Sequence, residues 1–215
     1  LQPGAVQRIC DGPSCRLAGS DELTERIKAS GAQCVAASCL GQCDRAPVAL
    51  SVEGELAFFG PMGGVTPADP QLPINLGGVP NPGHAAVRKP RQMSPEAVIA
   101  EIEAAALQGR GGAGFPAAFK GRGVRAHLER DPVLVGNADE GEPGTFKDRV
   151  IMEKNPHLLL EGILICCKAV NIQTAYIYIR GEFVFATQRL QQAIDESYEA
   201  GILGNDCLGS GLNID

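Results

Sequence analysis

The chain has 215 residues, of which 44% are hydrophobic and 20% charged, so it can form one large domain or two small ones. Its formal net charge of -6 argues against a general nucleic-acid binder, and no apolar run approaches the ~20 residues of a membrane-spanning helix. Eight cysteines without a secretory signal favour reduced thiols. We therefore expect a cytoplasmic protein in which some cysteines bind metal.

Residues 1–60 carry the pattern of a small α/β domain. Ser20-Asp21 offers an N-cap for a helix that Gly31 ends. The strand patterns cover residues 6–9, 35–37, 48–52 and 56–59, the last two as a hairpin around Glu53-Gly54.

Residues 61–93 are rich in proline and glycine, which leave little room for regular structure. We interpret this segment as an extended linker that wraps over a neighbour. We interpret the basic residues Arg88, Lys89 and Arg91 at its end as a solvated cluster, with a contact to a phosphate or a partner subunit as the alternative.

Residues 94–215 show a second α/β pattern. A helix starts at Ser94-Pro95, presents an apolar face that extends to Ala106, and ends at Gly109. A second helix starts with the same combination at Asn155-Pro156 and runs to Val170. Further strands are predicted at 133–135 and 174–179, and a further helix at 184–200.

Four cysteines form two sequence pairs. Cys10 and Cys15 are spaced C-x4-C, and Cys39 and Cys43 are spaced C-x3-C. Neither pair has the C-x2-C form of zinc knuckles or thioredoxin-type redox sites. Two pairs from two loops suit a [2Fe–2S] cluster, whose irons each take two thiolates, although zinc-bound or free cysteines remain the alternative. The spacing assigns no role to Cys34, Cys166, Cys167 and Cys207.

The segment Gly109–Gly114 matches G-x-G-x-x-G, but it follows a helix, whereas a dinucleotide-binding loop of the Rossmann type follows a strand. A glycine loop of this kind can still hold a phosphate through backbone N–H groups, with Lys120 adding positive charge. A surface turn is the alternative. Ligands of α/β folds bind where strands end, and there the chain places four polar residues: Asn137, Asp139, Glu140 and Glu142. A solvated acidic turn is the alternative here, and it explains poorly why Pro143 and Gly144 stiffen the loop.

Two resemblances cover most of the chain. ICDGPSC and ASCLGQCDRAP resemble the thioredoxin-like [2Fe–2S] domain of the small electron-transfer subunit of bacterial NADH dehydrogenases (respiratory complex I). MSPEAVIAEIEAAALQGRGGAGFPAAFKG, GNADEGEPGTFKDRVIMEKNPHLLLEG and AYIYIRGEF resemble the flavoprotein subunit of the same enzymes, and the related subunits of NAD-reducing hydrogenases and NAD-dependent formate dehydrogenases. The resemblance implies three parts: a thioredoxin-like [2Fe–2S] domain (1–60), a linker (61–93) and the N-terminal part of an α/β FMN/NADH-binding domain (94–215).

The resemblance also implies the site. Cys10, Cys15, Cys39 and Cys43 would ligate the [2Fe–2S] cluster, and Glu142 would lie near the nicotinamide as the catalytic residue. The FMN- and NADH-binding residues would be Gly109, Arg110, Gly111, Gly112, Phe115, Lys120, Asn137, Asp139 and Glu140, with Phe115 near the adenine.

The implied reaction is hydride transfer from NADH to FMN, followed by one-electron transfer to iron–sulfur clusters. The chain would be one part of a multisubunit dehydrogenase, soluble or peripheral to a membrane complex, with no membrane insertion of its own. A [4Fe–4S] cluster is also implied by the family, but the cysteines present here lack its ligand spacing. The alternatives are a [2Fe–2S] electron carrier without catalysis and a zinc-binding structural fragment.

Overall fold

The computed structural model describes residues 6–53, 56–60, 85–127, 132–209, 211 and 213–215. The protein is a mixed α/β chain with two compact units. The first unit contains residues 1–78, 138–154 and 179–189, and the second contains 79–137, 155–178 and 190–215. Most of the expected linker, residues 61–84, lies outside the described residues.

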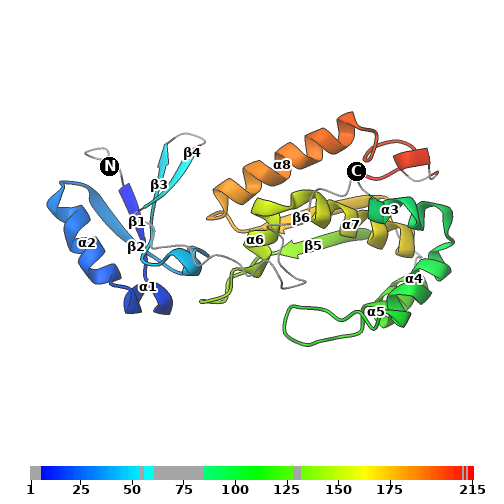
Figure 1. The fold of residues 1–215 in the computed structure, drawn as a ribbon, viewed down its shortest axis with the longest axis horizontal. Coiled ribbons are helices and arrows are strands. Elements are labelled where there is room, and N and C mark those ends of the chain that lie inside the picture. The colour runs from blue at the N-terminus through cyan, green and yellow to red at the C-terminus, as the bar shows by residue number, and fades with distance from the viewer. Residues whose placement is uncertain (1–5, 54–55, 61–84, 128–131, 210, 212) are drawn as a thin grey trace. The chain divides into compact units, whose positions relative to one another are not determined.

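The first unit contains a four-stranded sheet of order β2-β1-β3-β4 (Figure 1). Strands β1 and β2 are parallel, whereas β3 is antiparallel to both β1 and β4. The strands are β1 (Val6–Cys10), β2 (Gln33–Ala37), β3 (Ala49–Glu53) and β4 (Leu56–Gly60), and the helical elements around them are α1 (Pro13–Leu17), α2 (Ser20–Ala29) and η1 (Cys43–Arg45). Ile9 of β1 packs with Leu23 and Ile27 of α2 in the core between helix and sheet. The four predicted strands and the α2 helix are confirmed.

Helix α1 was not predicted, and the expected cap of α2 is wrong. Gly19 occupies the N-cap position of α2, and Ser20 is the first helical residue. Gly19 has a φ of 94°, a conformation that glycine adopts without the steric clash of a Cβ atom. The chain therefore turns at Gly19, and no side chain caps the helix.

The second unit is built around α7 (Pro156–Val170), which packs on the two-stranded sheet of β5 (Val133–Ala138) and β6 (Thr174–Ile179) (Figure 1). Ile163 and Leu164 of α7 are buried there, against Leu134 and Ile177 of the strands. The predicted cap is confirmed, because the Asn155 side chain accepts a hydrogen bond from the Leu158 N–H at 3.3 Å. The strands and this helix were correctly predicted.

Helices α4 (Pro95–Ala104) and α5 (Ala117–Arg125) pack on another face of α7 through Val98, Ile99, Ala118 and Ala169. Ser94 caps α4 as predicted, accepting from the Ala97 N–H at 3.2 Å. The expected end at Gly109 is wrong: the helix ends at Ala104, because Ala106 has a φ of 50° and turns the chain away. Ala106 is therefore exposed rather than part of the apolar face.

Three further corrections concern helices. The end of the expected linker is helical, with α3 (Ala85–Arg88) and η3 (Pro90–Gln92), because Val87 is buried in the core around α7. Helices α5 and α6 (Lys147–Lys154) were not predicted. The predicted C-terminal helix is confirmed as α8 (Val184–Glu199) and is followed by η4 (Cys207–Gly209). Among the described helices, none is both long and apolar enough to span a bilayer.

Candidate functional site

The two cysteine pairs meet in one pocket of the first unit. Cys10 ends β1 and Cys39 follows β2, and these neighbouring parallel strands are paired up to Cys10 and Ala37. Parallel strands end at the same edge of a sheet, so the loops that carry Cys15 and Cys43 start side by side. The pocket is lined by Cys10, Gly12, Pro13, Ser14, Cys15, Cys39, Cys43, Pro143 and Gly144.

The sulfur atoms are grouped as pairs. The Cys39 and Cys43 Sγ atoms lie 3.4 Å apart, and the Cys10 thiol is near enough to Cys15 to contribute to the raised pKa of Cys15. All four thiols are free, and Cys10, Cys15 and Cys39 are buried. Within the part of the chain that the structure describes, no three or more His, Cys, Asp or Glu side chains are grouped to hold a single metal ion.

The surroundings of the sulfurs combine burial with backbone donors. Burial and the neighbouring Cys10 thiol raise the pKa of Cys15 to about 12. Burial also raises the pKa of Cys43, with a further contribution from Cys39, while the Gly144 N–H opposes the shift. Backbone N–H groups donate to three sulfurs: Leu40 to Cys10 at 3.5 Å, Gly41 to Cys39 at 3.4 Å and Gly144 to Cys43 at 3.3 Å.

These features suit thiolate ligands of an iron–sulfur cluster. A buried thiolate without a cation is unfavourable, and a bound metal ion offsets that cost because its positive charge stabilises the thiolate that coordinates it. Amide N–H groups that donate to the sulfurs are a recurrent means of stabilising cluster thiolates.

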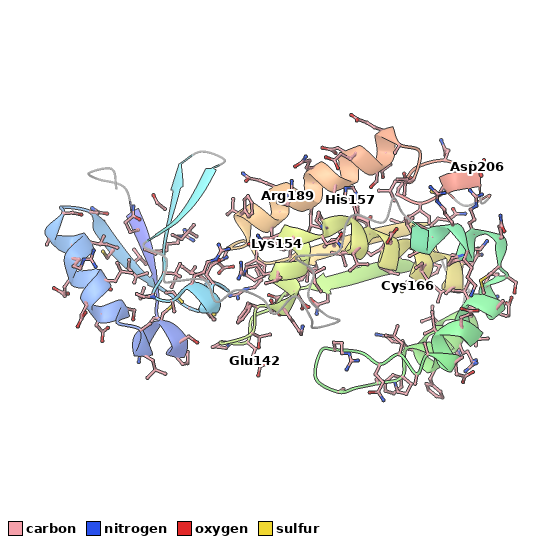
Figure 2. The ribbon with its side chains drawn as sticks, viewed as in Figure 1. Glu142, Lys154, His157, Cys166, Arg189 and Asp206 are labelled. Atoms are coloured by element: carbon pink, nitrogen blue, oxygen red, sulfur yellow. The ribbon has the colours of Figure 1, made fainter. Side chains whose placement is uncertain are left out.

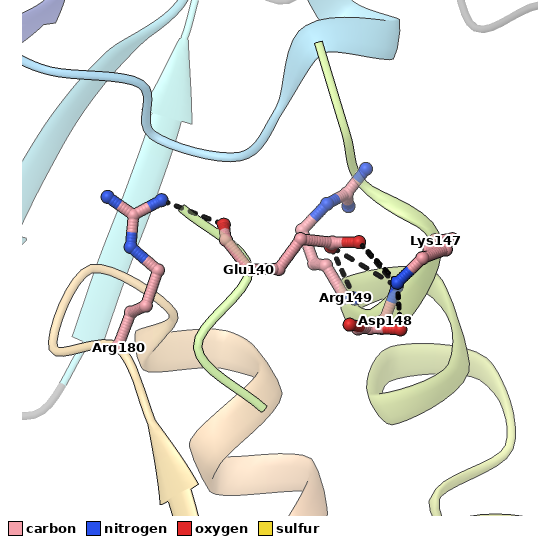
Figure 3. A network of polar contacts seen from close by, with 5 residues as sticks. All are labelled: Glu140, Lys147, Asp148, Arg149 and Arg180. Atoms are coloured by element: carbon pink, nitrogen blue, oxygen red, sulfur yellow. Dashed lines mark hydrogen bonds and ion pairs between the residues drawn. The ribbon is translucent and has the colours of Figure 1, made fainter. Parts of the chain in front are cut away.

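The acidic turn (residues 139–144) follows β5, and polar contacts hold it in place on two sides (Figure 3). The Glu140 carboxylate accepts hydrogen bonds from the backbone N–H groups of Asp148, at 3.0 and 3.2 Å, and Arg149, at 3.2 Å. Lys147 Nζ lies 3.5 Å from the same carboxylate. Glu140 is 5% exposed. Its carboxylate stabilises the first turn of α6, because the N–H groups of that turn have no acceptor within the helix.

Arg180, directly after β6, holds the other side of the turn. It donates to the Glu140 carbonyl oxygen at 3.0 Å, and its Nε lies 3.6 Å from Asp139 Oδ1. Its side chain is 11% exposed and stacks near the Phe183 ring. Arg180 was not among the predicted site residues. The sequence does show that Arg180 follows the predicted strand 174–179, just as the acids follow the predicted strand 133–135, and this parallel could have suggested it.

Glu142 lies in the loop between β5 and α6 and is exposed (Figure 2). The Thr145 N–H donates to its carbonyl oxygen at 3.0 Å, which closes a tight turn around Pro143 and Gly144. Asn137 and Asp139 are also exposed. The structure thus brings Asp139, Glu140 and Glu142 together on one loop of the first unit, next to the cysteine pocket that Gly144 lines.

The glycine loop belongs to the second unit and joins α4 to α5. The Gly109 N–H donates to the Phe115 carbonyl oxygen at 2.9 Å, and the Ala117 N–H donates to Leu107 at the same distance. Gly112 and Gly114 have φ values of 115° and 62°, which side-chain-bearing residues rarely adopt. Helix α4 is the element directly before the loop, as predicted, so the loop is not of the Rossmann type.

The predicted ligand residues of this loop are exposed: Gly109, Arg110, Gly111, Gly112, Phe115 and Lys120. The Phe115 ring packs edge-on against Phe119, with ring centroids 5.7 Å apart. Lys120 projects from α5, which follows the loop directly. Because the glycine loop and the acidic turn belong to different units, a pocket shared by them stays a prediction.

Comparisons with known proteins support the second resemblance. The family described as "Nuo51 FMN-binding domain" matches residues 102–214. The chain is 48% identical over 132 residues to an NADH-quinone oxidoreductase subunit of Rhizobium meliloti (strain 1021), covering 61% of this chain and 31% of that protein. It is 49% identical over 122 residues to the mitochondrial NADH-ubiquinone oxidoreductase 51 kDa subunit of Aspergillus niger, covering 55% and 25%.

A solved structure is similar over nearly the whole chain. The NAD+-reducing [NiFe]-hydrogenase in its H2-reduced state matches with a TM-score of 0.75 and 27% identity, covering 93% of this chain and 40% of that chain. This chain therefore spans less than half the length of the proteins it matches. Since the family match covers more than half of its residues, the chain belongs to the Nuo51 FMN-binding domain family.

Proposed function

We propose that the chain is an NAD(H)-linked electron-transfer module of a multisubunit dehydrogenase of the NADH dehydrogenase, formate dehydrogenase or hydrogenase type. It would bind FMN and NAD(H) in residues 94–215 and a [2Fe–2S] cluster in residues 1–60, with 61–93 as linker. When bound, FMN supplies the exchange between a two-electron hydride donor and one-electron acceptors. In such a complex the module is soluble or peripheral, in the cytoplasm.

One observation carries the proposal. The turn with the candidate nicotinamide-facing acid, Glu142, continues into Pro143 and Gly144, which line the pocket of the four cysteines. A dinucleotide site and a one-electron acceptor joined in this way suit a protein that passes electrons from one to the other. The sheet order β2-β1-β3-β4, with β3 antiparallel to β1, supports a thioredoxin-like domain, and the hydrogenase match over 93% of the chain supports the fusion.

The residues fit the cofactors by their chemistry. Among the described residues, no atom lies within 4 Å of the place where a Cβ would stand at Gly111 or Gly112, so a phosphate can approach the loop backbone there. Arg110 and Lys120 would supply positive charge. Asn137 and Asp139 would hold polar groups of the flavin at the strand end, and the exposed Phe115 ring would stack on the adenine.

The two acids of the turn have different tasks in this proposal. The Glu140 carboxylate is occupied with the N-terminus of α6, so Glu140 would serve the flavin by holding the turn in place. Glu142 is exposed, and its carboxylate would accept hydrogen bonds from the nicotinamide end of NADH and orient it for hydride transfer.

The cysteines favour the binuclear cluster over the alternatives. Two pairs of neighbouring thiols match the ligand demand of two irons. A structural zinc ion needs four ligands around one point.

Anaerobic purification of the full chain tests the proposal through three readouts: the absorption spectrum, the iron, sulfide and zinc contents, and the flavin fluorescence after denaturation. Flavin with iron and sulfide supports it. Cluster bands without flavin favour the electron carrier without catalysis, and a colourless zinc protein favours the structural fragment. Either of the last two results would overturn the proposal.

A further inference from the structure

The acidic turn ends at Gly144, whose backbone N–H donates a hydrogen bond to the sulfur of Cys43, one of the four candidate cluster ligands. The Gly144 N–H lies 3.3 Å from Cys43 Sγ, although the two residues are 101 positions apart in the sequence. Both belong to the first unit, and Pro143 and Gly144 form part of the lining of the cysteine pocket. A loop of the flavoprotein-like segment (residues 94–215) therefore forms part of the wall of the cysteine pocket.

The other two backbone donors come from the loop that follows β2 and carries Cys39. Leu40 and Gly41 follow Cys39, so both N–H groups lie in the loop after β2; Gly41 donates to Cys39 of that loop, and Leu40 donates to Cys10 at the end of β1. Gly144 differs because its position depends on the anchoring of the acidic turn by Arg180 and by the Glu140 cap. Gly144 has a φ of 90°, a backbone conformation that favours glycine.

A donor at this place acts on the redox equilibrium. The reduced form of a cluster carries one more negative charge than the oxidised form, and part of that charge resides on the sulfurs. A hydrogen bond to a ligand sulfur stabilises the reduced form more strongly, and it raises the reduction potential.

We propose that the Glu142–Gly144 turn sets the reduction potential of the [2Fe–2S] cluster through the Gly144 N–H, an inference that rests on the proposed function. The turn thus has two roles: its first residue faces the dinucleotide, and its last tunes the acceptor. Cluster potential is controlled from the flavoprotein-like segment and not by the cysteine domain alone.

The test compares two alanine variants of the full chain, purified anaerobically. Gly144→Ala puts a side chain at φ +90°, where no atom of the described residues lies within 4 Å, so it strains the turn without a collision among them. Gly31→Ala is the matched control, because Gly31 has φ +85°, likewise has no atom within 4 Å in the described part of the chain, and follows α2 in the same unit. The midpoint potential is measured by mediated titration with electron paramagnetic resonance, and exchangeable protons near the reduced cluster by electron–nuclear double resonance in D2O.

In Gly144→Ala we expect the reduction equilibrium to shift about tenfold toward the oxidised form, which is ~59 mV for a one-electron couple, together with loss of one coupled exchangeable proton. Gly31→Ala should match the unmodified chain in both readouts. Full iron content with unchanged potential and unchanged proton coupling in Gly144→Ala overturns the inference. Loss of iron and sulfide from Gly144→Ala alone also overturns it, because the turn would then retain the cluster rather than tune it. If the unmodified chain binds no iron or sulfide, the proposed function itself fails.

Discussion

The close packing of Phe183 against Gly41 gives the sharpest test of how the loop that carries Cys39 and Cys43 is packed. Gly41 has φ +69°, and a Cβ atom there would lie 2.3 Å from Phe183 Cε1 and 2.7 Å from its Cζ. Phe183 is 2% exposed, so its ring has little room to move. We therefore expect Gly41→Ala to destabilise the chain by two additive effects, backbone strain and overpacking.

The magnitudes follow from these two effects. A side chain in the left-handed region costs about 1–2 kcal/mol, and overpacking a core costs about 1–3 kcal/mol more. Gly31→Ala shares the backbone strain and the change in unfolded-chain entropy, but its Cβ meets no atom within 4 Å among the residues that the structure describes. The difference between the two variants in free energy of unfolding therefore isolates the collision, at about 1–3 kcal/mol.

Urea denaturation followed by circular dichroism, in reducing buffer, measures both variants. Repeating the pair in a Phe183→Ala background removes the ring that Gly41→Ala would meet. The difference between the two alanine variants should then fall below about 0.5 kcal/mol, the usual limit of additivity for independent sites. A difference that persists without the Phe183 ring would refute the packing described here.

Four further variants test the site. Cys39→Ser should lose iron and sulfide while flavin content is kept, whereas Cys34→Ser should change neither; retention of the full cluster in Cys39→Ser would remove it from the ligands. Glu142→Gln should slow flavin reduction by NADH far more than it lowers flavin content, as followed by stopped-flow absorbance, and an unaltered rate would contradict its placement. Arg180→Met removes a charged donor to the Glu140 carbonyl and should lower the free energy of unfolding by about 1.5–3 kcal/mol. An unchanged free energy of unfolding would mean that the contact between Arg180 and the acidic turn does not stabilise the protein.

Glu161 predicts a pH dependence of stability. It is 1% exposed on α7, and burial raises the pKa of its carboxyl above the ordinary value of 4.5. Folding therefore favours the protonated form, and this contribution to stability is present below pH 4.5 and is lost as the pH rises through the raised value. Glu161→Gln should gain stability over the unmodified chain at pH 7 and little at pH 4, as measured by urea titration. An equal gain at both pH values would exclude ionisation as the cause.

Local interactions made much of the fold predictable. Ser94-Pro95 and Asn155-Pro156 marked two helix starts because capping acts within three or four residues of the chain. The strands were visible for the same reason, as short runs bounded by turn residues. Helices α5 and α6 were missed because glycines in one and charged residues in the other masked their apolar faces.

For the site, the sequence by itself determined which cysteines pair and which loops carry the acids and glycines, since spacing and composition are local properties. Only the tertiary structure decided that Arg180 clamps the acidic turn, that Phe183 closes on Gly41, and that Gly144 donates to Cys43. Those contacts join residues 40 to 142 positions apart, and they depend on which faces pack together. Hydrophobic burial selects those faces across the whole unit, and no local pattern in the chain encodes the choice.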